Sequence, residues 1–311
     1  MEHNAGACDF RTSQSWTILS PIEQSIKRKI EAVGVPLREW DIQINYGIKT
    51  GYNEAFIISE AKRDEILGNC TDNSERQRTA ELIRPILRGR DIKRYGYEDS
   101  KMYLIATFPA RNYDIDQYPA VKSYLLSFAE PMLRKAGLDW VADNHLADFC
   151  YQKLAQTGQY VEIAEQRIRI GSEDEKARKR TTNKWFETQD SISYWEDFSL
   201  PKIVYPETTQ GAYFALDTEK HMLDKTCFFM ISAVPLYLQS TLASHLFEFA
   251  YKRIFSSIEL GTNGYQYNKH ALVKLPIIQT NEDIRLTNAD IYRLYGISEE
   301  EIEFIESQYI Q

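Results

Sequence analysis

The spacing of apolar residues changes from a helical to a strand period within the first fifty positions, and this change most constrains the fold. Ser20, with Pro21 after it and Glu23 three residues on, forms a capping box, and apolar residues then recur on one helical face as far as Gly34. From position 42 to 48 they alternate with polar residues instead, as in a strand with one buried face. Such a chain combines helices and sheets.

The rest of the chain continues this alternation without a regular βα repeat. Helices are predicted at 22–33, at 60–67, from Pro119 onward and over 236–254, and strands at 103–108, 202–205, 213–216 and 226–231. We therefore predict an α+β fold, a mixed-sheet domain with peripheral helices. Two short helical pieces hinged at Gly296 are predicted to form a C-terminal tail. The expected divisions are a flexible N-terminus at 1–15, a main domain at 16–278 and an acidic helical tail at 279–311.

Two segments place a glycine-bearing turn beside an apolar anchor, as binding loops often do. We expect residues 42–58 to form a hairpin whose loop presents four polar side chains outward: Lys49, Thr50, Tyr52 and Asn53. The second segment, residues 84–94, holds five cations against the single acid Asp91. Its candidate contacts are Arg88, Arg90, Lys93 and Arg94. Arginine forks suit phosphate oxygens and the edge of guanine. An ordinary polar hairpin and a solvated cationic face are the alternatives.

Two later segments carry further candidate contacts. A basic run precedes an aromatic pair at 185–186, and its candidates are Arg178, Lys179, Arg180 and Lys184. The loop at 261–268 joins glycines to amides and tyrosines, with Asn263, Tyr265 and Gln266 as candidates. Amide side chains pair with adenine in the major groove, and tyrosine can stack on a base or reach a phosphate. Solvated surface and a packed turn are the respective alternatives. His245 is interpreted as a hydrogen-bonded helix residue rather than a catalytic one.

The net charge of −8 conceals an uneven distribution. Residues 282–311 hold eight acids and two arginines, a net of −6, so the other 281 residues carry 35 cations against 37 acids, or −2. The body of the chain is nearly neutral, and its cations gather at 84–94 and 176–184. Because the local field governs attraction to phosphate, this composition is compatible with binding nucleic acid in a salt-sensitive way.

These segments, taken in order, resemble a known family. The motifs lie at 16–23, 34–41, 46–53, 87–92, 103–109, 118–122, 184–187, 202–206, 275–277 and 291–297. They are similar to the TaqI-like C-terminal specificity domain, the target-recognition part of adenine-specific DNA methyltransferases and type IIG restriction-modification enzymes. Residues 138–179 match no motif that we can assign. The resemblance implies a bacterial module that reads a double-stranded DNA sequence for a methyltransferase or endonuclease module, in cis or in trans.

The motifs of the catalytic parts do not occur in the sequence. An adenine methyltransferase needs an Asn-Pro-Pro-Tyr or Asp-Pro-Pro-Tyr loop and a glycine-rich turn for S-adenosylmethionine, and the 311 residues contain neither. We therefore expect no enzyme activity from this chain alone, and S-adenosylmethionine and Mg²⁺ only on the catalytic parts of the system. One alternative is a metal-dependent nuclease built from Asp139, Asp143, Asp148 and Lys153. Another is an interaction subunit of a phage-defence complex that reads no bases.

Cysteine spacing and hydropathy suggest a cytoplasmic protein. Cys8, Cys70, Cys150 and Cys227 are widely separated with no Cys-x-x-Cys pair, which favours reduced thiols over a zinc site or disulfides. The most apolar stretch, 227–238, is too short for a membrane span, and the first residues lack the pattern of a secretory signal. We expect no metal site and no membrane contact.

Overall fold

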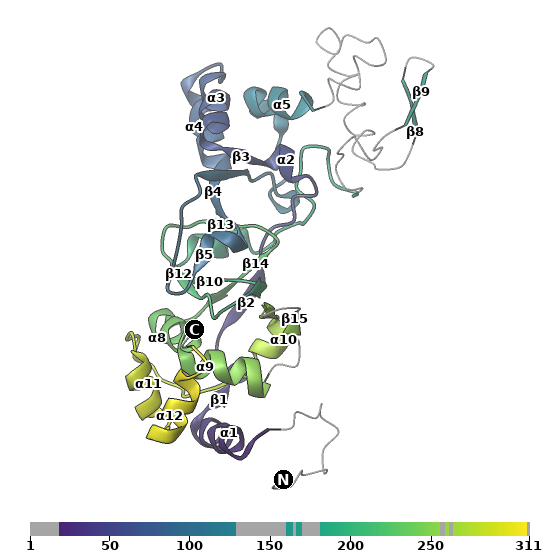
Figure 1. Ribbon diagram of the computed structural model, residues 1–311. Helices are drawn as coiled ribbons and strands as arrows, with labels where there is room; N and C mark the ends of the chain where they lie inside the picture. Colours follow the sequence, from purple (N-terminus) through teal and green to yellow (C-terminus); the bar gives the residue numbers. More distant parts are fainter. Residues whose placement is uncertain are drawn as a thin grey trace. The chain divides into compact units, whose positions relative to one another are not determined.

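The computed structural model describes residues 19–128, 160–163, 166–169, 181–255, 259–260 and 264–309 (Figure 1). The chain folds into two compact units and passes between them more than once. Unit 1 comprises residues 1–47, 88–98 and 197–311, and unit 2 comprises residues 48–87 and 99–196. The segment 88–98, which carries four of the nine candidate cations, is thus an insertion from unit 1 between two stretches of unit 2.

Unit 1 is built from small antiparallel sheets and short helices. Its strands are β1 (Val35–Pro36), β2 (Gln43–Tyr46), β5 (Ile92–Lys93), β6 (Gly96–Tyr97), β10 (Lys202–Pro206), β11 (Thr208–Thr209), β12 (Ala215–Asp217), β13 (Met222–Leu223), β14 (Cys227–Ile231), β15 (Glu259–Leu260), β16 (Gly264–Gln266) and β17 (Pro276–Ile277). The central sheet has the order β12-β10-β14-β2, while β11, β16 and β15 form a second sheet. β1 pairs with β17, and β5 pairs with β6.

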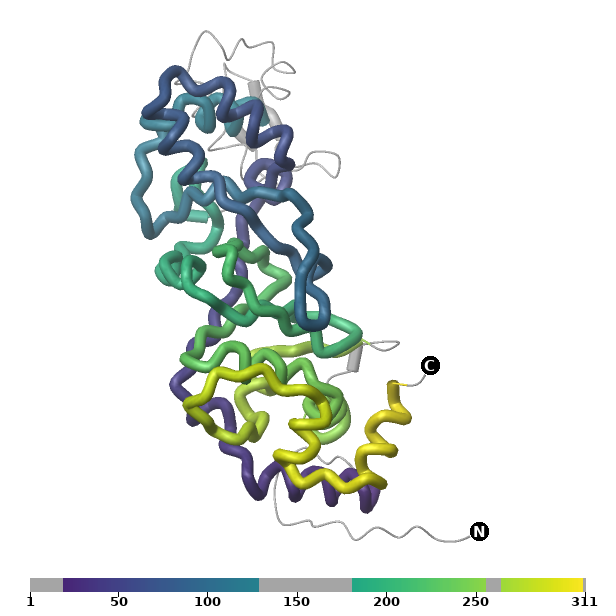
Figure 2. Tube along the Cα trace, turned by 90° about the vertical axis from the view of Figure 1, so that its left-hand side faces the viewer, coloured from purple at the N-terminus to yellow at the C-terminus, as the bar shows by residue number. Residues whose placement is uncertain are grey.

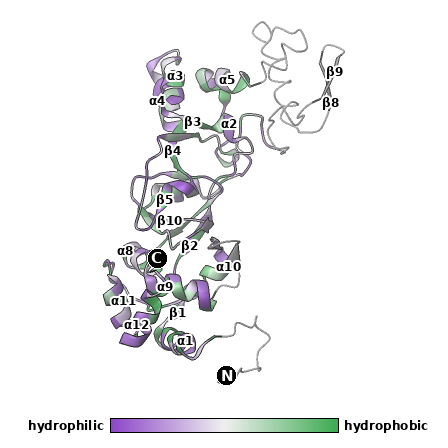
Figure 3. Ribbon diagram, viewed as in Figure 1, coloured by the Kyte–Doolittle hydropathy of each residue, from purple (hydrophilic) through white to green (hydrophobic). Residues whose placement is uncertain are grey.

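The helices of unit 1 share one apolar core with the central sheet. They are α1 (Pro21–Val33), α8 (Pro235–Leu242), α9 (His245–Ala250), α10 (Lys269–Leu272), α11 (Asn288–Leu294) and α12 (Glu299–Glu306), with a π-helical turn at Tyr251–Phe255. Figure 2 shows α1, in purple, beside the C-terminal helices in yellow, and Lys29 of α1 lies 2.6 Å from the carboxylate of Glu301. Ile291 and Ile305 are buried in this core, although α12 is largely hydrophilic along its length (Figure 3). The C-terminal residues are therefore part of the packed unit.

Unit 2 has an antiparallel sheet and a cluster of helices. Its elements are α2 (Asn53–Phe56), β3 (Ile57–Ser59), α3 (Glu60–Gly68), α4 (Asn73–Leu82), β4 (Ile83–Leu87), β7 (Met102–Ile105), α5 (Pro119–Leu126), β8 (Tyr160–Ile163) and β9 (Gln166–Arg169). β7 pairs with both β3 and β4, and β8 pairs with β9. Apolar side chains of the sheet and helices fill the interior, among them Phe56, Ile66, Leu104 and Leu125.

The α+β class predicted from the sequence is confirmed, and several elements begin at the predicted residues. α1 begins after Ser20, with both hydrogen bonds of its capping box present. α3 overlaps the polar helix predicted at 60–67, and α5, β7, β10, β12 and β14 overlap the other predicted elements. Gly296 takes a φ of +62° between α11 and α12, and the Ser298–Glu301 capping box opens α12. Local signals are sufficient at these positions because caps and hinges depend on neighbouring residues.

The predicted hairpin at 42–58 is wrong. β2 pairs with β14 along its whole length, and residues 53–56 form the helix α2 before β3 turns to pair with β7. After β2, the amide of Gly47 donates to the carbonyl of Cys227 at the start of β14. Only glycine fits at this position, because a Cβ would lie 1.8 Å from the carbonyl oxygen of Asp224. The alternation of apolar residues indicated a strand but could not indicate its partner.

Two helix predictions also need correction. The apolar spacing over 236–254 predicted one helix, whereas the structure divides it at Ser244, whose hydroxyl accepts from the amide of Phe247 and caps α9. The helix α4 was not predicted, because its apolar residues show little periodicity. Asp72 caps α4 and accepts from the amide of Glu75 at 2.7 Å. Internal caps of this kind are visible in a sequence only as single polar residues.

Candidate functional site

The segment 88–98 of unit 1 begins with a tight turn closed by its own side chains. The guanidinium of Arg88 donates to both carboxylate oxygens of Asp91, at 3.0 and 3.2 Å, and the Asp91 carboxylate also accepts from the amide of Arg88. Asp91 is buried. Gly89 lies close to Thr226, the residue before β14. Its amide donates to Thr226 Oγ1 at 2.9 Å, and a Cβ on Gly89 would also lie 2.9 Å from that oxygen. Arg88 is thus committed to the turn.

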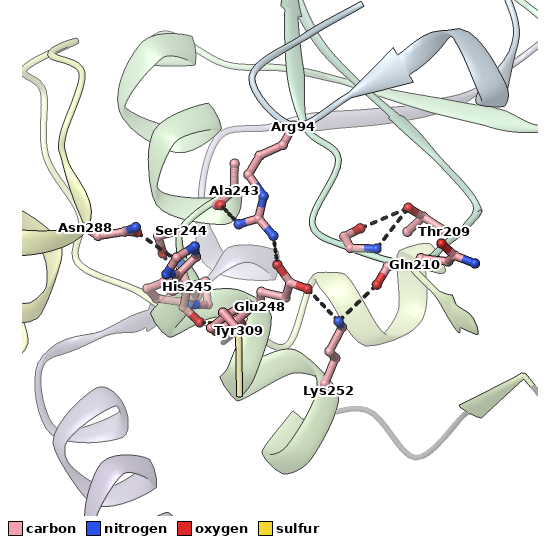
Figure 4. A network of polar contacts seen from close by, with 12 residues as sticks. Arg94, Thr209, Gln210, Ala243, Ser244, His245, Glu248, Lys252, Asn288 and Tyr309 are labelled. Carbon is pink, nitrogen blue, oxygen red and sulfur yellow. Dashed lines mark hydrogen bonds and ion pairs between the residues drawn. The ribbon is translucent and has the colours of Figure 1, made fainter. Parts of the chain in front are cut away.

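The far end of this segment is fastened by Arg94. Its guanidinium donates to the carbonyl of Ala243 at 2.8 Å and forms an ion pair with Glu248, which is buried in α9 (Figure 4). The next residue, Tyr95, has a φ of +68°, and its hydroxyl donates to the same Ala243 carbonyl. Burial opposes the charge of Arg94, but the carboxylate of Glu248 outweighs it and raises the Arg94 pKa. Arg94 therefore acts as an anchor for the β5–β6 turn.

Glu248 holds a second cation, so the anchor is a network rather than a single pair. Lys252 lies 2.5 Å from the other carboxylate oxygen and also donates to the carbonyl of Gln210 (Figure 4). The ammonium of Lys252 stands 4.4 Å from the centre of the Tyr265 ring on β16. Through Glu248 the β5–β6 turn, α9 and the sheet that contains β16 are connected.

Arg90 and Lys93 are the exposed cations of the segment. No hydrogen bond or ion pair joins the Arg90 guanidinium to any other residue that the structure describes. Lys93 donates to the carbonyl of Arg90 at 2.9 Å and lies 3.9 Å from Glu98. The four predicted cations therefore separate into two pairs: Arg88 and Arg94 hold the fold, and Arg90 and Lys93 face solvent.

The prediction of a loop at 261–268 is wrong for residues 264–266, which form β16 of the second sheet of unit 1 and pair with β11 and β15. Gln266 donates to the carboxylate of Glu207 at 3.0 Å, and its backbone carbonyl accepts from the hydroxyl of Tyr251. Tyr267 is buried, and Asn268 caps α10. Tyr265 and Gln266 are half-buried and thus partly accessible at the sheet edge.

In unit 2 the loop 49–53 is closed by hydrogen bonds of Thr50. Thr50 was expected to point outward, but it is only 1% exposed, and its hydroxyl donates to Asn53 and accepts from the amide of Tyr52. The Tyr52 ring meets Phe128 edge-on at 5.5 Å, and burial raises its pKa, with Glu54 adding to the effect. Lys49 and Asn53 are the exposed side chains. Thr50 cannot read a base edge from this position because it closes the loop.

The segment 183–191 lies against this loop and carries Lys184. The amides of Gln189 and Asp190 donate to the carbonyls of Thr50 and Lys49, at 3.0 and 3.2 Å. Asn183 donates to the carbonyl of Gln189, which closes the segment on itself. The ammonium of Lys184 is exposed and lies 5.6 Å from the centre of the Phe186 ring. Lys49 and Lys184 thus belong to one hydrogen-bonded group of loops in unit 2.

Several predicted residues lie outside the described parts of the structure: Arg178, Lys179, Arg180 and Asn263, together with the alternative metal cluster of Asp139, Asp143, Asp148 and Lys153. Within the described ranges, no group of three or more His, Cys, Asp or Glu side chains is placed to hold a metal ion. Cys70 and Cys227, the two described cysteines, are free thiols. The predicted absence of a cofactor on this chain remains a prediction.

The sequence reasoning did not identify the acids that organise these loops. Glu248, Asp190 and Glu207 hold Arg94, the backbone amide of Lys49 and the side-chain amide of Gln266, respectively. Each lies far along the chain from its partner, so no local spacing could have indicated the contact. His245 was read correctly as a bonded helix residue, since its Nδ1 lies 2.9 Å from Glu306 and its ring stacks on Tyr309 at 4.1 Å.

A family model of known proteins matches part of the chain. Residues 148–277 match the family model of the TaqI-like C-terminal specificity domain. This confirms the resemblance inferred from the motifs. The matched range includes the candidates at 178–184 and 263–266, and it extends into the stretch 138–179, where the sequence shows no motif that we can assign. The motifs at 46–53 and 87–92 lie before the specificity-domain match.

Among solved structures, the chain is similar to the type IIG restriction endonuclease BpuSI, with 12% sequence identity and a TM-score of 0.48. The alignment covers 92% of this chain and 28% of that enzyme, so the chain spans just over a quarter of its length. A search of curated proteins gave no match. In the described residues no helix is both long enough and apolar enough to cross a membrane.

Proposed function

We propose that this chain is the sequence-recognition module of a bacterial type II restriction-modification system and directs a methyltransferase or endonuclease to its DNA site. The observation that carries the proposal is the match of residues 148–277 to the specificity domain. The loop geometry supports it, because polar side chains and cations are presented on loops held by buried ion pairs and backbone hydrogen bonds. Recognition needs such fixed geometry, since base edges differ only in the positions of donors, acceptors and methyl groups.

The candidate residues take two roles in this proposal. Arg90 and Lys93 in unit 1, with Lys49 and Lys184 in unit 2, are exposed cations suited to phosphate contacts, which position the protein without reading sequence. The basic run at 178–180 has the same proposed role. Asn53, Asn263 and Gln266, with the rings of Tyr52 and Tyr265, are proposed to contact base edges. Arg88 and Arg94 hold the segment that carries Arg90 and Lys93, and Thr50 holds the loop that carries Asn53.

Catalysis belongs to other parts of the system in this proposal. The catalytic module would lie in cis or in trans, would carry S-adenosylmethionine and Mg²⁺, and would act in the cytoplasm on the site that this chain selects.

Selection of bound duplexes from a random library tests the proposal. The purified chain should enrich a short common motif, and a duplex that bears this motif should remain bound in excess competitor DNA, because specific sites bind roughly 10³-fold or more tightly than random ones. Enrichment of no motif, with equal affinity for all duplexes, would identify a non-reading subunit. Metal-stimulated cleavage by the chain alone would instead support the nuclease alternative.

A salt titration separates the contacting cations from the anchoring ones. Changing Arg90 and Lys93 together to Ala should reduce the slope of log affinity against log salt by about two units, roughly 0.9 for each phosphate that is no longer neutralised, and leave the melting temperature unchanged. Changing Arg94 to Ala should lower the melting temperature, because Glu248 loses its partner. Arg293, which is 80% exposed and pairs with Asp290 in unit 1, is the matched control. An Arg90/Lys93 variant with the parental slope would remove both residues from the interface.

A further inference from the structure

One arginine of unit 2 that no motif included stacks on aromatic rings. Arg111 ends a short 3₁₀ turn (Pro109–Arg111), and Asn112, with a φ of +48°, redirects the chain after it. The guanidinium carbon of Arg111 lies 3.9 Å from the centre of the Trp195 ring and 5.4 Å from that of Tyr113. Arg111 is exposed, and among the residues that the structure describes no carboxylate lies within ion-pair distance of it.

Arg63 in the same unit also stacks on an aromatic ring, but carboxylates pair with its charge. Its guanidinium carbon lies 4.2 Å from the centre of the Tyr103 ring, so it also stacks on an aromatic face. Unlike Arg111, it donates to Asp64 at 2.7 Å and stands 3.8 Å from Glu60. The Arg63 charge is balanced within its helix. Stacking is thus common to both residues, and the unbalanced charge distinguishes Arg111.

The turn that carries Arg111 is hydrogen-bonded to one of the loops proposed above to contact DNA. The amide of Ala110 donates to the carbonyl of Ser191 at 3.2 Å. The two preceding residues, Gln189 and Asp190, donate to the carbonyls of the loop that carries Lys49. One short segment therefore supports the Lys49 loop on one side and the Arg111 turn on the other, with Lys184 at its start.

A stacked guanidinium is well suited to bind a phosphate. The aromatic face holds the plane of the group and leaves the N–H donors along its edge available, so less rotational freedom is lost when an anion binds. Guanidinium donors match the oxygens of a phosphate in a two-point, charge-assisted contact. An exposed arginine without a carboxylate partner offers all of this binding capacity to an external anion.

We infer that Arg111, seated on Trp195, contacts a backbone phosphate of bound double-stranded DNA and extends the cationic surface of Lys49 and Lys184. This inference rests on the proposed function. Arg111 adds a contact that carries no base information, so it should affect all duplexes alike. Its role is therefore in affinity and in salt dependence, and sequence preference should be unaffected.

The test compares Arg111→Gln with Arg63→Gln in the full chain, using both a selected duplex and a random one. Arg111→Gln should weaken binding to both by roughly tenfold, about the effect of removing one charge-assisted hydrogen bond, and reduce the salt slope by about one unit. Arg63→Gln should leave the slope unchanged. Equal melting temperatures of Arg111→Gln and the parent protein would exclude a folding effect.

Arginine modification of the unaltered protein gives an independent measurement. Phenylglyoxal labelling followed by peptide mass spectrometry should show that DNA protects Arg111, and that Arg63 labels at the same rate with and without DNA. If the chain binds DNA but Arg111 is neither protected nor needed for the salt slope, this inference is overturned and the proposed function stands. If the chain binds no duplex at all, both fail together.

Discussion

Replacing Asp217 with Asn should lower the free energy of unfolding of unit 1 by about 3–5 kcal/mol, as the removal of one partner from a buried ion pair does. Asp217 and Lys202 are both fully buried, and their oxygen and nitrogen lie 2.6 Å apart. The same carboxylate accepts from the ring and the amide of His221 and from the hydroxyl of Tyr97 on β6. Asn would remove the negative charge that faces the ammonium of Lys202, which also donates to the carbonyl of Phe198. Chemical denaturation of the two proteins measures the difference.

Two matched variants give this prediction its controls. Lys202→Met should lower the free energy of unfolding less than Asp217→Asn does. The Asp217 carboxylate would still accept hydrogen bonds from the ring of His221 and from two backbone amides. Glu31→Gln, in an exposed pair with Lys27 on α1, should cost less than about 1 kcal/mol. If Asp217→Asn is no more destabilising than Glu31→Gln, the buried cluster does not stabilise the sheet.

The same carboxylate predicts how stability depends on pH. Burial by itself would raise the pKa of Asp217, but the hydrogen bond from His221 and the charge of Lys202 lower it to about 2. Because this pKa is lower in the folded state than in the unfolded state, where it is about 4, the carboxylate stabilises the fold at pH values above about 4. This contribution of roughly 2 kcal/mol is lost as the pH falls towards 2. The stability gap between the parent protein and Asp217→Asn should therefore narrow between pH 4 and pH 2. A constant gap over this range would show that the carboxylate titrates normally.

Glu248→Gln should have the second largest effect, because one buried carboxylate holds two cations. Glu248 is 2% exposed and pairs with Arg94 and Lys252 (Figure 4). A neutral amide leaves both cations without a balancing charge, and we expect the free energy of unfolding to fall by roughly 2–3 kcal/mol. The β5–β6 turn should also loosen, which amide hydrogen exchange of Tyr95 would report, since its amide donates to Phe214.

Glu306→Gln is the matched control for this variant. Glu306 accepts from Tyr292 and pairs with His245, but its side chain is 36% exposed, so water can take the place of these partners. We expect a smaller decrease in stability and unchanged exchange at Tyr95. If Glu248→Gln weakened DNA binding with no change in exchange or stability, Glu248 would act at the interface and not as an anchor.

The sequence by itself determined the fold class, the starts of several elements and the resemblance to a specificity domain. Capping boxes at Ser20 and Ser298 and the hinge at Gly296 are local devices, since each depends on residues within one helical turn. β10, β12 and β14 overlap the short strands predicted at 202–205, 213–216 and 226–231, because a short apolar run is visible without knowledge of the neighbouring strands. The motifs likewise indicated a resemblance to the TaqI-like specificity domain, whose family model matches residues 148–277.

Only the tertiary structure decided which candidate residues are free to bind. Arg94 and Arg90 look equivalent in the sequence, yet Glu248, 154 residues after Arg94, anchors one and leaves the other exposed. Thr50 looked like a loop donor until the structure placed its hydroxyl between Tyr52 and Asn53. β2 pairs with β14, and Gly47 after it approaches the carbonyl of Asp224 too closely for a Cβ. Partners far along the chain leave no local pattern, since long-range contacts depend on how the chain closes on itself.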